Sequence, residues 1–144
     1  MKSTLLRSTL AALACAGALA FASPSMAAMV NMKADLKGSN EVPAVDSKGT
    51  GSVTVTYDTA SKKLSWKGSV SGLSGPATAA HFHAGESGKN GAVVVPITGA
   101  DKGSFEGEAT LTDAQAADMQ AGKWYVNIHT ADNKGGEVRG QLMK

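Results

Sequence analysis

Cysteine is almost absent from this chain of 144 residues, since Cys15 is the only one. A single cysteine excludes an internal disulfide and a cysteine-lined metal site, so burial alone has to hold the fold. Histidine is scarce as well, with three residues, which makes the position of each one informative. No apolar run after the N-terminal one is long enough to cross a bilayer.

The N-terminal residues have the pattern of a secretory signal peptide. Lys2 and Arg7 precede an uncharged apolar run, and small residues spaced like a cleavage site follow in SPSMA. We expect residues 1–27 to be a signal peptide and the protein to be exported, to the periplasm or outside the cell. The alternatives are a retained N-terminal anchor, and lipidation at Cys15, which would leave an unusually short hydrophobic region.

The expected mature chain, residues 28–144, is electrically balanced. Removal of Lys2 and Arg7 leaves 12 basic residues against 12 acidic ones. Nucleic acids and anionic membranes need a clustered positive surface, so we expect neither as a partner. The lack of a second long apolar run predicts no membrane span after cleavage. About 117 residues suffice for one domain with a real core.

Short alternating segments separated by turn residues predict an all-β sandwich or barrel. In one of them Val53, Val55 and Tyr57 alternate with serine and threonine. About eight strands are expected, at residues 29–38, 51–58, 63–73, 77–85, 91–99, 103–112, 123–130 and 136–144. One segment differs, because Thr112 followed by Gln115 predicts a helix cap and Gly122 predicts the end of a short helix.

Two of the three histidines flank Phe82 in AHFHAG. In a strand, His81 and His83 would project from one face, about 6.5–7 Å apart along the chain. His129 lies on the polar face of WYVNIHT together with Tyr125 and Asn127, opposite the apolar residues. A histidine that only fills the core would be expected on the apolar face.

Three imidazoles without a thiolate suit a copper ion, with zinc as the alternative. Idle surface histidines are the other interpretation, because the spacing does not show that the two strands are neighbours. The methionines lack the clustering of a copper(I) site, and we assign them to the chain ends and to packing. No Gly-x-Ser-x-Gly motif accompanies the histidines, so the sequence predicts no serine hydrolase and no catalytic residue.

Arg139 is the only arginine after the predicted leader. It shares a strand face with Glu137 in GGEVRGQL, and its fixed charge could orient an anion near the histidines. The alternatives are a Glu137–Arg139 ion pair, or bonds from Arg139 to loop carbonyls. We place Arg139, Glu137 and Asn127 around the metal ligands, and we expect Glu41 to serve the scaffold rather than the metal.

Four blocks of this sequence, NEVP, AHFHAG, YVNIHT and GGEVRGQL, occur together and in order. Their order resembles that of the CHRD domain, named after chordin and widespread in secreted bacterial proteins, from about Met32 to Leu142. One departure is Ala44, where the family commonly has a second proline. Chordin's domains act in extracellular growth-factor antagonism, so the resemblance also implies a metal-free module that binds another extracytoplasmic protein.

The CHRD pattern is in turn distantly similar to copper/zinc superoxide dismutases, which implies a Greek-key, immunoglobulin-like or superoxide-dismutase-like β-sandwich. By position, His81, His83 and His129 resemble copper ligands, and Arg139 resembles the arginine near the open coordination position. The bridging histidine, zinc loop and disulfide of those enzymes are missing here. The resemblance therefore implies copper capture or handling rather than an enzyme, with a degenerate redox enzyme as a further alternative.

Overall fold

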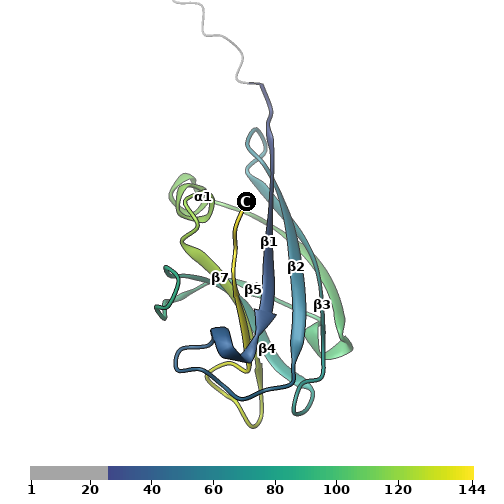
Figure 1. Ribbon diagram of the computed structural model, residues 1–144. Helices are drawn as coiled ribbons and strands as arrows, with labels where there is room; N and C mark the ends of the chain where they lie inside the picture. The colour runs from purple at the N-terminus through teal and green to yellow at the C-terminus, as the bar shows by residue number, and fades with distance from the viewer. Residues whose placement is uncertain (1–25) are drawn as a thin grey trace, which may run out of the picture.

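The computed structural model describes residues 26–144, and eight strands form a single antiparallel sheet within them (Figure 1). The predicted signal peptide and Cys15 lie outside the described residues, apart from residues 26 and 27. No helix in the described part is long and apolar enough to span a membrane. The strands are β1 (Met29–Lys37), β2 (Thr50–Asp58), β3 (Lys63–Ser71), β4 (Ala77–Ala84), β5 (Val93–Ile97), β6 (Ser104–Thr110), β7 (Trp124–Thr130) and β8 (Val138–Gln141).

Every segment predicted as a strand overlaps one strand of the structure, and β2 begins one residue before its predicted segment. The alternation also gives the correct core face, because Val53, Val55 and Tyr57 are all buried on β2. Side chains of a strand alternate between its two faces, so these three positions point together into the interior. The prediction of an all-β, sandwich-like fold with about eight strands is confirmed.

The strand order is β5-β4-β7-β8-β1-β2-β3-β6, and the two halves of the sheet are joined where β8 meets β1. That joint is slight, since Lys37 and Arg139 are the paired residues and Lys33 forms an isolated bridge with Met143. The sheet can therefore fold over at this seam and bring its two apolar faces together, as in the curled sheet of Figure 1.

Aromatic side chains from both halves meet in the core. The ring of Trp66 on β3 meets Phe82 of β4 edge-on, with centroids 5.2 Å apart. The ring centroid of Phe82 in turn lies 6.0 Å from that of Trp124 of β7. Phe82 separates the two histidines of β4 in sequence, so its burial in the core forces both imidazoles onto the opposite face of the sheet.

The predicted helix is α1 (Asp113–Gln120), which connects β6 with β7. The hydroxyl of Thr112 accepts a hydrogen bond from the Gln115 backbone, and the Gln115 side chain accepts one from the Thr112 backbone. This reciprocal pair is the predicted capping box. Gly122 follows the helix with φ of 75°, a left-handed conformation that glycine adopts without strain.

Candidate metal centre

The three histidines come together on one face of the paired strands β4 and β7. His81 and His83 lie on β4 and His129 lies on β7, and the two strands are antiparallel neighbours. One ring nitrogen from each histidine can be chosen so that all three lie within 4.8 Å of one another. Two nitrogens that ligate one ion at 2.0–2.1 Å are at most about 4.2 Å apart. Small side-chain rotations would therefore bring all three to one ion.

Backbone carbonyls fix the orientation of two of the imidazoles. Nδ1 of His83 lies 2.9 Å from the carbonyl oxygen of Gly91, and Nδ1 of His129 lies 2.8 Å from that of Lys134. A carbonyl only accepts, so both Nδ1 atoms carry the hydrogen, and in the neutral imidazoles the lone pair is on Nε2. Metal-binding histidines are commonly held by a hydrogen bond of this kind from the other ring nitrogen.

The third imidazole is held by its neighbour. Nδ1 of His81 lies 3.2 Å from Nε2 of His129. Since Nε2 of His129 has no hydrogen, Nδ1 of His81 donates to it. The ring centroids of His81 and His83 are 5.5 Å apart, and those of His81 and His129 are 5.1 Å apart.

The surroundings keep two of the imidazoles neutral. Burial lowers the pKa of His81, and the nearby His129 and His83 lower it further. Burial also lowers the pKa of His83, which is 8% exposed, and this effect outweighs the hydrogen bond to Gly91 that favours the charged form. Neutral imidazoles have the lone pair that a metal ion needs.

The polar face of β7 does not face solvent, which corrects part of the sequence interpretation. Tyr125 and Asn127 point away from the core as predicted, but they are only 2% and 3% exposed. The loop of residues 85–91 covers Tyr125, whose hydroxyl lies 3.1 Å from the Gly91 backbone nitrogen. Asn127 instead contacts the β7–β8 connection, where its Nδ2 lies 3.4 Å from the Gly135 carbonyl oxygen. The ring of Tyr125 also stacks on that of His83, with centroids 4.8 Å apart.

Arg139 of β8 is buried against the other side of Tyr125. Its guanidinium carbon lies 3.5 Å from the centre of the Tyr125 ring, and the residue is 2% exposed. Its donors bond to the Asn90 side chain at 2.9 Å and to the Lys89 carbonyl at 2.7 Å. These contacts match the alternative in which Arg139 bonds to the covering loop. Its anion-orienting role stays a prediction.

Glu137 is paired with hydroxyl and amide groups instead of with Arg139. Its carboxylate accepts hydrogen bonds from the side chains of Ser47, Ser74, Thr130 and Asn133 and from the Ser74 backbone. Burial raises the pKa of Glu137, but these bonds outweigh burial and lower it to about 2. The carboxylate thus joins loops from three parts of the chain beside the strands of the site.

Glu41 lies outside the histidine cluster and is 6% exposed. Burial raises its pKa to about 7, although Arg139 and Asn127 act in the opposite direction. Sequence reasoning assigned Glu41 to the scaffold and did not anticipate a buried carboxyl group. It also missed the carbonyls of Gly91 and Lys134, because no side-chain pattern reveals which backbone oxygens face an imidazole.

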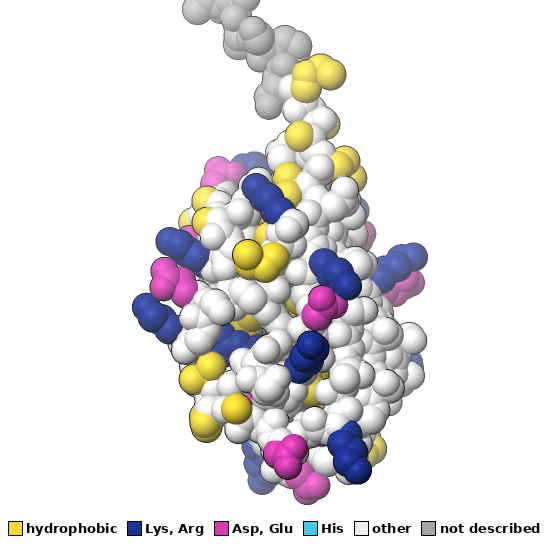
Figure 2. All heavy atoms as spheres, in the orientation of Figure 1, with side chains coloured by type: hydrophobic (Ala, Val, Ile, Leu, Met, Phe, Trp, Pro, Cys, Tyr) yellow, Lys and Arg dark blue, Asp and Glu magenta, His cyan; other side chains and the backbone are white. Residues whose placement is uncertain are grey.

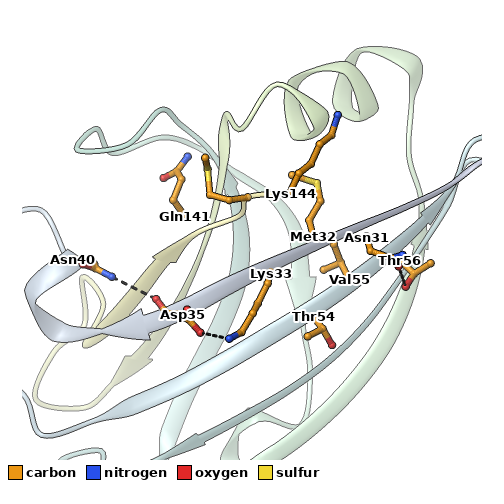
Figure 3. Close-up of a pocket in the computed structure, with 11 residues that line it drawn as sticks. Asn31, Met32, Lys33, Asp35, Asn40, Thr54, Val55, Thr56, Gln141 and Lys144 are labelled. Carbon is orange, nitrogen blue, oxygen red and sulfur yellow. Dashed lines mark hydrogen bonds and ion pairs between the residues drawn. The ribbon is translucent and has the colours of Figure 1, made fainter.

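A groove of about 640 Å³ lies elsewhere on the described part of the molecule (Figure 3). It follows β1, β2 and the C-terminal residues and contains none of the histidines. Its polar side chains satisfy one another: Lys33 pairs with Asp35 at 2.8 Å, and Thr56 donates to Asn31 at 2.9 Å. Figure 2 shows acidic and basic side chains interspersed on this face, so it presents no block of one charge.

Comparison with known proteins identifies the family of the chain. No curated protein and no solved structure matches it, so the distant similarity to superoxide dismutases stays a prediction. The CHRD domain matches residues 32–142, which covers seven of the eight strands completely and all three histidines. This chain therefore belongs to the CHRD domain family.

Proposed function

We propose that this protein binds a single copper ion through His81, His83 and His129, with zinc as the alternative metal. The proposal depends on one observation: three ring nitrogens, carried by two neighbouring strands, lie within 4.8 Å of one another. In His83 and His129 the bond from Nδ1 to a carbonyl leaves the lone pair on Nε2. The Nε2 lone pair of His129 accepts from His81, a hydrogen bond that the ion would replace. The ligand set therefore needs little ordering when the ion arrives.

The donor types support copper or zinc over magnesium or calcium. Imidazole nitrogen suits copper and zinc, whereas magnesium and calcium prefer several carboxylate or carbonyl oxygens. No acidic residue joins the three histidines within the described residues. With the export predicted from the N-terminal sequence, this donor set favours capture or handling of copper outside the cytoplasm.

The test is a titration of metal-free protein with copper(II), copper(I) and zinc. Wild-type protein should bind one equivalent of copper, and the double variant His81→Ala, His83→Ala should bind none while still unfolding cooperatively. A matched control replaces Thr54 and Thr56 with alanine, two positions on one face of β2 away from the histidines, and should keep full binding.

Two results would refute the proposal. One is unchanged copper affinity in the folded double histidine variant. The other is wild-type protein that takes up no copper or zinc and is purified from its native compartment with background metal content. That second result would favour the alternative function, a metal-free module that binds another extracytoplasmic protein.

A further inference from the structure

Asn127 occupies the middle of the histidine cluster. It lies on β7 directly opposite His81 of β4, and it is two residues from His129 on the same strand face. Its diagonal neighbour is His83, which pairs with Tyr125. Side chains of directly opposed residues lie about 4.5–5.5 Å apart at Cβ, and diagonal neighbours lie about 7–8 Å apart. Asn127 is therefore next to all three histidines.

The amide of Asn127 is also oriented by acceptors on one side. Its Nδ2 lies 3.4 Å from the carbonyl oxygen of Gly135. A carboxyl oxygen of Glu41 lies on the same side, since a Cβ on Gly136 would come within 2.4 Å of Glu41 Oε1 and 2.6 Å of Asn127 Nδ2. Gly136, with φ of 125°, leaves room for both groups. The NH2 end of the amide faces these acceptors, so its oxygen points the other way.

The oxygen at that other end has no partner. Oδ1 of Asn127 and Nε2 of His83 are both buried without a hydrogen bond among the described residues. The amide nitrogen faces the Gly135 carbonyl, so Oδ1 lies on the side of the amide away from Gly135, toward the neighbouring histidines of β4. A buried oxygen and a buried ring nitrogen that both lack a hydrogen-bond donor would both be satisfied by a cation bound between them.

We propose that Oδ1 of Asn127 is a fourth donor to the bound ion, on the buried side of the site, and that the Gly135 carbonyl positions it by accepting from the amide nitrogen. This inference rests on the proposed function and adds a selectivity to it. Three nitrogens and a neutral oxygen favour copper(II) and zinc over copper(I), because copper(I) prefers soft sulfur donors and gains little from an amide oxygen. The side of the ion away from Asn127, next to the half-buried His81 and His129, stays open.

The first experiment measures copper(II) and copper(I) affinities of the variant Asn127→Leu with competing chelators. Leucine has nearly the same size and no donor atom. Copper(II) affinity should fall about tenfold or more, as for other groups that act on a metal site, while copper(I) affinity changes little. A tenfold fall in the ratio of copper(II) affinity to copper(I) affinity raises the reduction potential of the bound copper by about 59 mV. The copper(II) electron paramagnetic resonance spectrum should change as well. Asn31→Leu, an exposed position on β1, is the matched control.

A further variant keeps the test decisive. Asn127→Asp places a carboxylate oxygen in the same position and should bind copper(II) and zinc at least as tightly as wild-type protein.

The outcomes separate this inference from the proposed function. Wild-type affinities and an unchanged spectrum in folded Asn127→Leu would overturn the oxygen donor and leave the three-histidine site standing. If Asn127→Leu does not fold, weaker copper(II) binding by Asn127→Asp would overturn it instead. Absence of copper binding in wild-type protein would overturn both proposals.

Discussion

Glutamine in place of Glu137 should destabilise this domain more than any exposed acidic substitution. The carboxylate accepts five hydrogen bonds, which reach it from the segment before β2, the β3–β4 connection, the end of β7 and the β7–β8 turn. Glutamine has the same shape but no charge, and its NH2 group cannot accept. The Ser74 backbone nitrogen or the Asn133 amide would then face another donor.

The magnitude follows from the pKa. The folded protein lowers the pKa of Glu137 from 4.5 to about 2. Each pKa unit corresponds to 1.36 kcal/mol, so the ionised form is stabilised by roughly 3 kcal/mol relative to the neutral form. An independent count agrees: a hydrogen bond to a charged group is worth about 1 kcal/mol more than a neutral one, and four of the five bonds are short. We therefore expect Glu137→Gln to lower the free energy of unfolding by about 2–3 kcal/mol at pH 7.

The pH dependence gives the sharper test. Because the folded protein lowers the pKa of Glu137, the unfolded chain binds the proton first as the pH falls. The contribution of Glu137 to the free energy of unfolding is therefore present above about pH 4.5 and is lost as the pH falls toward 2. Urea unfolding of metal-free protein should show a difference between wild type and variant that drops to less than half its neutral value by about pH 3. Glu106→Gln, an exposed control on β6, should stay within about 0.5 kcal/mol of wild type. A difference below about 1 kcal/mol at pH 7, or one that does not change with pH, would refute the reasoning.

Two other perturbations can be checked by standard measurements. In metal-free protein, His81 and His83 should titrate by NMR below the ordinary value of 6.5. Because they are neutral when folded and protonate first when unfolded, stability should fall as the pH drops below about 6.5; titration at or above 6.5 would contradict this. Thr112→Ala should cost about 1 kcal/mol by removing the cap of α1, measured by urea unfolding. Wild-type stability of that variant would show that the helix does not depend on its cap.

The sequence predicted the elements of the fold because their signals are local. Alternation of apolar and polar residues identifies a strand and its buried face, as Val53 and Val55 show on β2. The cap residue Thr112 and the terminator Gly122 mark the ends of α1 in the same way. The common face of His81 and His83 is equally local, since it follows from a separation of two residues.

The neighbourhood of those histidines could not be predicted, because it depends on pairings between distant segments. That β4 lies beside β7 is a property of the strand order, and only this order brings His129 to the other two. The burial of Arg139 depends on the loop of residues 85–91, and the burial of Asn127 involves the β7–β8 connection. Polar residues in alternation suggest exposure to solvent instead. The residues that contact the histidines could therefore be identified only from the structure.

That covering loop links the histidines to the rest of the scaffold. Arg139 donates to the Lys89 carbonyl in the loop. Two residues further along, the Gly91 carbonyl accepts from Nδ1 of His83. A Cβ on Gly91 would lie 1.6 Å from the Ala84 carbonyl oxygen, so the loop can approach β4 this closely only with glycine there. Arg139 thus acts on His83 through the loop backbone and through the shared ring of Tyr125. In the proposed metal complex, these contacts would give Arg139 a part in holding the ligand His83, and its anion-orienting role stays a prediction.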